Sequence, residues 1–220
     1  MRLRLLAVLL MVSAAAAASN GAMHTVWKIG ESDNSARELA LGPDGYSKFL
    51  EHDFGYEDRY FLVGHSVASK DFPYILPGPD DGWGGTSGTA GLRTHEVNIL
   101  FALQSVKTTD EACLTVDLAG VNARRALVKA TVNGRSITVE FNGTSDSAAY
   151  GRATADDERL LVFPLAASDL RVGGNSVTIT VLEGSWIVFD HVCLEATRGV
   201  KMAPLHRDFF VRSVAAAPYE

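Results

Sequence analysis

Successive short stretches of the chain alternate between apolar and polar residues, which is the pattern of β-strands with one buried face. In the stretch 113–118, for example, Leu114, Val116 and Leu118 alternate with Thr115 and Asp117. Comparable stretches, separated by Gly, Pro, Asn and Asp, lie at residues 25–30, 59–65, 95–103, 126–141, 159–164 and 176–182. The sequence therefore predicts a series of short strands joined by turns.

Residues 126–141 have the pattern of a β-hairpin. Apolar residues occupy alternate positions on both sides of the pair Asn133 and Gly134. Asn-Gly is the preferred pair for a type I′ turn, because both central positions of that turn need a positive φ. We therefore predict a two-residue turn at this pair, with one strand on each side.

The stretch 184–196 differs because it is apolar at consecutive positions, so both of its faces need cover. With strict alternation, Asp190 lies on one face and His191 lies on the other. Trp186, Val188, Val192 and Leu194 then share the face of Asp190, and Ile187, Phe189 and Cys193 share the face of His191. We expect a central strand of a sandwich, in which the two polar side chains either have backbone partners or lie exposed at a sheet end.

About eight or nine such strands and one weak helical stretch, residues 46–54, indicate an all-β fold. Turn residues recur between the strands, and no internal repeat is present. We predict an antiparallel β-sandwich of the jelly-roll kind.

The length of 220 residues, 47% of them hydrophobic, suits one sizeable domain with a packed core. Arg2 and Arg4 precede an apolar run and then small residues, which is the layout of a secretory signal peptide. We expect a signal peptide at 1–18, a sandwich domain at 19–196, and a tail or linker at 197–220, for which an extra edge strand is the alternative. The mature protein is expected to be secreted and to contain no membrane-spanning segment.

The formal net charge of the chain is −6, and it becomes −8 when Arg2 and Arg4 are removed. A charge of this sign repels nucleic acid and anionic membranes, so we expect neither as a partner. Cys113 and Cys193 either form a disulfide in an oxidising compartment or remain free thiols packed as small apolar groups.

Motifs of well-known catalytic sites are absent from the sequence, including Gly-x-Ser-x-Gly, His-Glu-x-x-His, a phosphate loop and Cys-x-x-Cys. This absence lowers the expectation of an enzyme, and no cofactor is expected. Asp156, Asp157 and Glu158 offer oxygen ligands for a structural calcium ion, although an acidic run at a turn is more often a solvated surface.

Charged and aromatic residues are most concentrated in the glycine-rich stretch 70–96. A loop this rich in Pro and Gly is ordered only when it packs on another part of the protein or on a ligand. Its aromatic residues are therefore candidates for ligand contact. The candidate ligand-binding residues are Tyr74, Asp81, Trp83, Arg93 and His95. Aromatic faces can stack on sugar rings while charged groups bind hydroxyls or a uronate carboxylate; the alternative is a loop of solvated charges.

Several short motifs, in their order along the chain, resemble one known family. They are Trp27 to Gly30, Tyr60 to Gly64, Lys70 to Tyr74, Val132 to Gly134, Phe163 and Pro164, Gly173 to Val177, and Gly184 to Asp190. With these motifs the chain resembles the third domain of rhamnogalacturonan lyases, polysaccharide lyase family 4, from about residue 27 to residue 195. The resemblance implies a jelly roll similar to galactose-binding-like carbohydrate-binding modules. In those lyases a separate N-terminal domain carries most catalytic residues, so the resemblance implies none here.

Three functions remain open at this point. The first is a secreted module that binds plant cell-wall polysaccharide of the pectic kind without cleaving it. The second is a lyase, or an ancillary part of one, in which Lys70, Tyr74 or His95 would be the base of a β-elimination and a cation would neutralise the uronate. The third is a non-catalytic domain that docks on a partner enzyme through residues 197–220.

Overall fold

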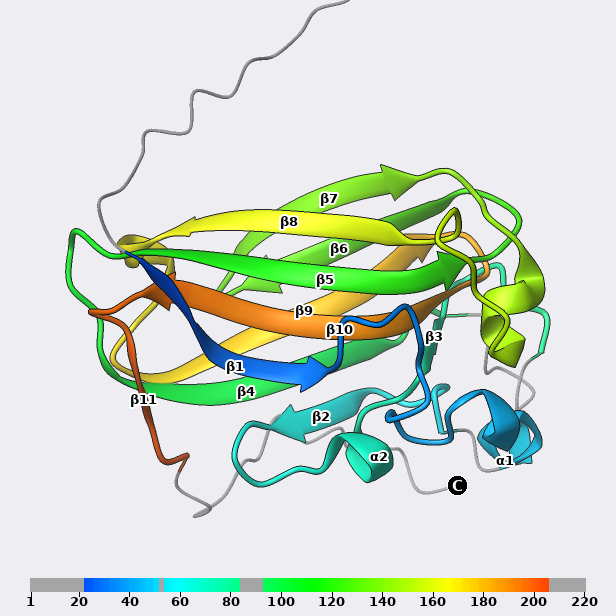
Figure 1. The fold of residues 1–220 in the computed structure, drawn as a ribbon, viewed down its shortest axis with the longest axis horizontal. Coiled ribbons are helices and arrows are strands. Elements are labelled where there is room, and N and C mark those ends of the chain that lie inside the picture. The colour runs from blue at the N-terminus through cyan, green and yellow to red at the C-terminus, as the bar shows by residue number, and fades with distance from the viewer. Residues whose placement is uncertain (1–21, 52–53, 84–92, 206–220) are drawn as a thin grey trace, which may run out of the picture.

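The structure, a computed structural model, describes residues 22–51, 54–83 and 93–205. In these residues eleven strands form two sheets, and the sheets pack face to face around one apolar core (Figure 1). The all-β sandwich predicted from the alternating pattern is confirmed.

The first sheet has the strand order β1-β10-β5-β8, and the short strand β3 shares an edge of β10 with β1. Its strands are β1 (Met23–Gly30), β3 (Ile75–Pro77), β5 (Glu111–Val121), β8 (Arg159–Ala166) and β10 (Trp186–Thr197). Every pair in this sheet is antiparallel.

The second sheet has the order β11-β4-β9-β6-β7, and β2 also pairs with β4. Its strands are β2 (Arg59–Leu62), β4 (Glu96–Ser105), β6 (Ala126–Val132), β7 (Arg135–Phe141), β9 (Gly173–Glu183) and β11 (Lys201–Ala203). The pair of β2 and β4 is parallel, and the other pairs are antiparallel.

The inward faces of the strands form the core, as the alternation predicts. Leu114, Val116 and Leu118 of β5 are fully buried. Across the sandwich, Trp27 of β1 packs on Phe101 of β4, with 5.4 Å between the ring centroids. Removal of these apolar surfaces from water is the main force that holds the two sheets together.

Strand β10 departs from strict alternation because it contains a bulge. Phe189 lies opposite Leu118 and His191 lies opposite Asp117, so Asp190 has no opposite residue on β5. Opposite residues share a face, so Phe189 points into the core with Leu118, where its ring is 5.0 Å from that of Phe72. The prediction that Phe189 shares the face of His191 is therefore wrong.

The predicted hairpin is confirmed. Strands β6 and β7 are joined at Asn133 and Gly134, whose φ angles are 49° and 99°. The Asn133 side chain also donates to the Asp169 carbonyl at 2.8 Å and accepts from the Ser176 backbone N–H at 3.0 Å. The turn is thereby fastened to the neighbouring β8–β9 connection.

Helical segments are short and lie in the connections. They are η1 (Pro43–Gly45), α1 (Tyr46–Glu51), α2 (Ala68–Asp71), η2 (Asp146–Tyr150) and η3 (Ala167–Asp169). The helix α1 lies within the predicted helical stretch 46–54. In the described part of the chain, none of the helices has the length and apolar character needed to cross a membrane.

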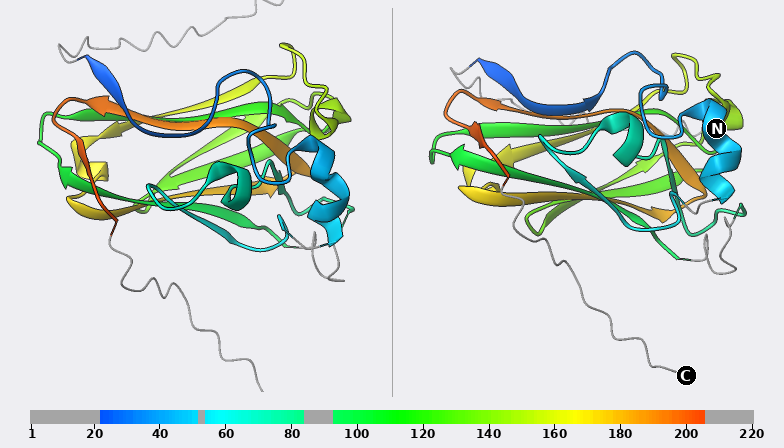
Figure 2. Two further views of the ribbon diagram at one scale, coloured as in Figure 1. Left: turned by 60° about the horizontal axis from the view of Figure 1, so that its bottom comes forward. Right: turned by 90° about the horizontal axis from the view of Figure 1, so that it is seen from below.

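The sandwich continues beyond residue 196. Strand β11 pairs with the end of β4 at the edge of the second sheet, so part of the expected tail is a short edge strand (Figure 2). The expected signal peptide at 1–18 and the last residues, 206–220, lie outside the described residues.

Candidate functional site

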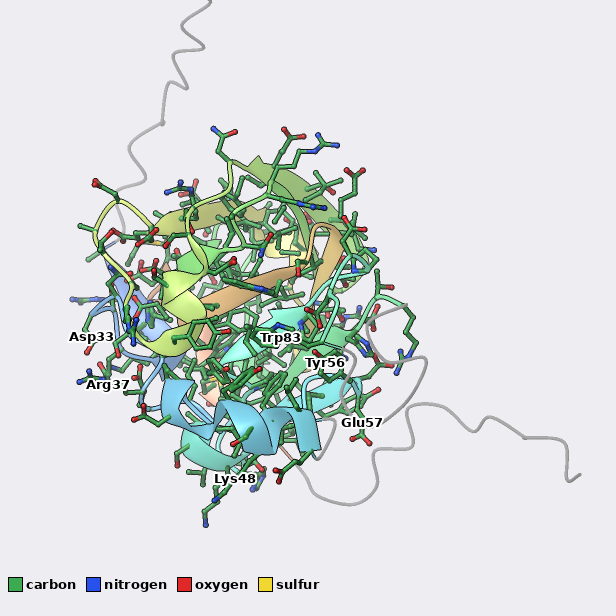
Figure 3. All side chains as sticks on the ribbon, turned by 90° about the vertical axis from the view of Figure 1, so that its right-hand side faces the viewer. Asp33, Arg37, Lys48, Tyr56, Glu57 and Trp83 are labelled. Carbon is green, nitrogen blue, oxygen red and sulfur yellow. The ribbon has the colours of Figure 1, made fainter. Side chains whose placement is uncertain are left out.

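One end of the sandwich, on the right in Figure 1, gathers connections from distant parts of the sequence. The segment after β1, the helix α1, the segment after β3, and the β5–β6, β7–β8 and β9–β10 connections all meet there. We call this surface the loop end, and Figure 3 looks directly at it. Binding residues commonly lie on loops that a rigid sandwich holds in place.

Three aromatic side chains from different connections meet at the loop end. Tyr46 of α1 is edge-on to Trp83, with 5.0 Å between the ring centroids, and Tyr150 of η2 is 5.6 Å from Tyr46. We call these three residues the aromatic cluster. Trp186 of β10 lies beneath Trp83 in a stacked arrangement at 6.5 Å. Tyr150 is 46% exposed and Tyr46 and Trp83 are half-buried, so the cluster presents part of its aromatic surface to the solvent.

Trp83 was a sequence candidate, whereas Tyr46 and Tyr150 were not. Tyr46 lies at the start of a predicted helix, and Tyr150 lies in the irregular segment after the hairpin. About one hundred residues separate these two tyrosines along the chain. No local pattern could therefore have brought them together.

Two other candidates, Tyr74 and His95, lie inside the protein. Both are 0% exposed. The Tyr74 ring packs on Phe49 of α1 at 5.4 Å, and His95 is edge-on to Tyr56 at 5.7 Å. The two rings belong to an internal aromatic group that holds α1 against the sandwich, so neither offers a surface to a ligand in this structure.

Asp81 also has an internal role. Its side chain is 6% exposed and accepts hydrogen bonds from the Tyr56 hydroxyl and, at 3.4 Å, from the Ser185 hydroxyl. These bonds connect the segment after β3 to the β9–β10 connection. Asp81 therefore fixes the chain on which Trp83 lies two residues later, and does not face the solvent as a binding group.

Arg93 is the one exposed charge among the five candidates. It precedes β4 at the loop end, and its guanidinium lies 3.5 Å from the carboxylate of Asp58. An ion pair at this distance between exposed groups is weak, so the guanidinium remains available to a second anion. The structure thus leaves Trp83 and Arg93 accessible and buries Tyr74, Asp81 and His95.

The residues considered for β-elimination are not gathered at one surface. Lys70 is exposed on α2, whereas Tyr74 and His95 are enclosed. Burial, together with the neighbouring Tyr150 and Tyr46, raises the pKa of Tyr74 above its ordinary value. The Tyr74 hydroxyl makes no hydrogen bond within the described residues, and it stays protonated at neutral pH.

Both cysteines are free thiols in the structure. Cys113 of β5 lies opposite Glu195, and Cys193 of β10 lies opposite Thr115, so the two cysteines are diagonal neighbours on the outer face of the first sheet. Burial raises the pKa of both thiols. Of the two alternatives left open by the sequence, the structure has the free pair.

The acidic turn considered for calcium is stabilised by hydrogen bonds between its own residues. Asp157 is buried, and its carboxylate accepts from the backbone N–H and the hydroxyl of Thr154 at 2.8 Å and 2.7 Å. Burial acts to raise the pKa of Asp157, but these bonds outweigh it and the pKa is lowered. The carboxylate thus stabilises a turn.

Three other carboxylates, those of Asp33, Glu38 and Asp190, lie within 4.8 Å of one another and could hold a cation. Asp190 accepts the Ser35 backbone N–H at 2.8 Å, and Glu38 accepts the Glu31 backbone N–H at 2.7 Å. The loop after β1 is thereby pinned to β10. Asp190 thus has backbone partners, which is one of the two arrangements expected for it.

Comparisons with solved structures give low similarities. A family 35 carbohydrate-binding module from an environmental isolate is 13% identical, with a TM-score of 0.36 over 49% of this chain and 69% of that chain. The family 35 module of Cellvibrio japonicus Abf62 is 17% identical, with a TM-score of 0.35 over 50% of this chain and 71% of that chain. Similarities this low do not indicate what the present chain binds.

An exo-β-1,3-galactanase from Phanerochaete chrysosporium is 17% identical, with a TM-score of 0.32 over 45% of this chain and 20% of that chain. No curated protein matches the chain. A sequence model does match, over residues 25–194, which include most of β1, most of β10 and every strand between them, and thus both sheets. It describes a domain similar to carbohydrate-binding modules, and the chain belongs to this family, the CBM-like domain III of polysaccharide lyase family 4.

Proposed function

We propose that the protein binds polysaccharide through the aromatic cluster at the loop end of the sandwich. The observation that carries the proposal is the meeting of Tyr46, Trp83 and Tyr150 at one accessible surface of a CBM-like domain. The apolar face of a sugar ring can lie on such a surface while its hydroxyls bond to the phenols and to nearby polar groups.

We propose further that the ligand is pectic and that it is bound without cleavage. The pectic ligand is supported by the resemblance to rhamnogalacturonan lyases and by Arg93, whose planar guanidinium can donate two parallel hydrogen bonds to a uronate carboxylate. The absence of cleavage is supported by the burial of Tyr74 and His95. Export through residues 1–18 would bring the protein to the plant cell wall.

The test is binding of the purified protein to homogalacturonan and rhamnogalacturonan, measured by retardation in polysaccharide-containing gels and by calorimetry. Trp83→Ala and Tyr150→Ala remove two rings of the cluster. We expect each change to weaken binding about fivefold or more, because each removes stacking worth roughly 1 kcal/mol or more.

Leu160→Ala is the matched control, because Leu160 is exposed to a similar degree, 50%, on the first sheet. Circular dichroism and thermal melting check that each variant is folded. A folded wild type that binds neither polysaccharide would refute the pectic ligand. Unchanged binding by Trp83→Ala and Tyr150→Ala would refute the cluster as the binding surface.

A further inference from the structure

Two polar hollows lie beside the aromatic cluster at the loop end. The first has a volume of about 320 Å³ and is lined by Asn34, Arg37, Ala148 and Gly151, among others. The second has a volume of about 330 Å³ and is lined by Asp80, Asn122, Arg124 and Asp146, among others. Each volume is at the lower end of the range for small-molecule sites, which suits one sugar ring rather than a chain.

The 3-10 helix η2 connects the hollows with the cluster. Asp146 lines the second hollow, Ala148 lines the first, and Tyr150 belongs to the aromatic cluster. A 3-10 helix has three residues per turn, so these three positions point along three different faces of η2. Asp80, which lines the second hollow, is three residues before Trp83 in the chain.

Each hollow contains one arginine that is free to bind a ligand. Arg37 and Arg124 are exposed and make no ion pair with any described residue. Arg37 stands to one side of Trp83 in the end-on view of Figure 3. Guanidinium groups donate to sugar hydroxyls and, more strongly, to uronate carboxylates.

Each hollow also contains hydrogen-bond acceptors beside its arginine. In the first hollow the acceptor is the carboxylate of Asp33, an exposed residue that also lines this hollow. In the second hollow the Asp146 carboxylate is an acceptor, and it is held in place by the Asn122 side-chain amide, which donates to it at 2.8 Å. Sugars present adjacent hydroxyls that both donate and accept, so a mixture of donors and acceptors suits them.

We propose that the two hollows and the aromatic cluster are three consecutive subsites for one oligosaccharide. The ligand is then an internal stretch of at least three sugar rings, with the middle ring on the cluster and the outer rings beside Arg37 and Arg124. This inference rests on the proposed function, and it adds the length of the ligand and the position of its outer rings.

The test uses the full chain and two size series, α-1,4-linked galacturonate oligomers and neutral β-1,4-linked galactose oligomers, each from one to six residues. Calorimetry gives the dissociation constant for each oligomer. In the series that binds, we expect affinity to rise at least tenfold from one residue to three and to change little beyond four or five. Each outer subsite adds hydrogen bonds only when a ring reaches it.

Arg37→Ala and Arg124→Ala test the two outer subsites directly. We expect each to weaken binding of the trimer about tenfold and to change binding of the monomer less than twofold, because a charge-assisted hydrogen bond is lost only from an outer ring. Arg171→Ala is the control, since Arg171 is an exposed arginine that precedes β9 at the opposite end of the sandwich.

Three results would overturn the inference while leaving carbohydrate binding intact. They are equal affinity for monomer and trimer, loss of hexamer binding when only its terminal residue is reduced, and trimer binding that both arginine variants retain. Failure of the folded wild type to bind any oligomer or polysaccharide would instead remove the proposed function itself.

Discussion

Replacing Asp117 by Asn is expected to stabilise the protein at neutral pH. Asp117 lies on β5, is 4% exposed, and has the carboxylates of Asp190 and Glu158 nearby. Its Oδ2 has the Ser32 hydroxyl as a donor at a long 3.3 Å, and its Oδ1 has no hydrogen-bond partner in the described chain. A buried carboxylate with so few donors is costly to ionise.

The magnitude follows from the pKa. Burial, then the charges of Asp190 and Glu158, raises the pKa of Asp117 from 3.8 to about 6. The folded protein therefore binds this proton more tightly than the unfolded chain does. Ionisation costs stability as the pH rises from about 4 to above 6, and the full cost is about 3 kcal/mol.

Urea unfolding at pH 4, 5, 6, 7 and 8 measures this cost. We expect the free energy of unfolding of Asp117→Asn to match wild type near pH 4 and to exceed it by about 3 kcal/mol at pH 7 to 8. Each variant is compared with wild type at the same pH, so the titrating groups that do not interact with Asp117 largely cancel. A difference that does not vary with pH, or a variant less stable than wild type at pH 8, would refute the reasoning.

The matched control for Asp117→Asn is Glu195→Gln, which changes an exposed carboxylate on the neighbouring strand β10. We expect this variant to alter the free energy of unfolding by less than about 0.5 kcal/mol at any pH in the series. A pH profile of Glu195→Gln resembling that of Asp117→Asn would show that general surface charge, and not the burial of Asp117, causes the effect.

Three further predictions concern stability and reactivity. Asn133→Ala should lower the free energy of unfolding, measured in urea, by about 2 to 4 kcal/mol, and Asn133→Gly should lower it by about 1 kcal/mol less, because Gly tolerates the positive φ. Equal losses for the two variants would contradict the role given to the positive φ. Phe49→Ala should lower the free energy of unfolding by about 3 to 5 kcal/mol and Tyr150→Ala by less than about 1 kcal/mol, since Phe49 is fully buried among rings and Tyr150 is half exposed. Comparable losses for the two variants would contradict this difference in burial. Cys113 and Cys193 should react slowly with a thiol reagent in the folded protein at pH 8, because burial raises the pKa of both thiols, and should react fully in denaturant. A denatured chain without free thiols would instead mean that the two cysteines form a disulfide.

Two elements could be predicted from the sequence alone because their information is local. The hairpin of β6 and β7 follows from Asn133 and Gly134 between alternating residues, and the buried face of β5 follows from its period of two. Such patterns report which face of a strand is apolar and where the chain must turn. They were sufficient to predict an all-β sandwich.

The candidate site depended on information that no local pattern contains. The stretch 70–96 has the composition of an exposed binding loop. Tyr74 and His95 are nevertheless buried against other aromatic rings, and Asp81 ties the stretch to Ser185. Whether a ring in an irregular segment is exposed depends on which distant segment covers it, and packing alone decides this.

The tertiary structure also brings together residues that are far apart in the sequence. Tyr46, Trp83 and Tyr150 come from three connections, and they meet because sheet topology brings those connections to one end of the sandwich. The bulge at Asp190 likewise arises from pairing between β10 and β5 and reverses the face of Phe189. The sequence by itself thus determined the strands, the turn and the class of fold. Exposure and proximity were decided only when the two sheets packed, because both depend on contacts between residues distant in the chain.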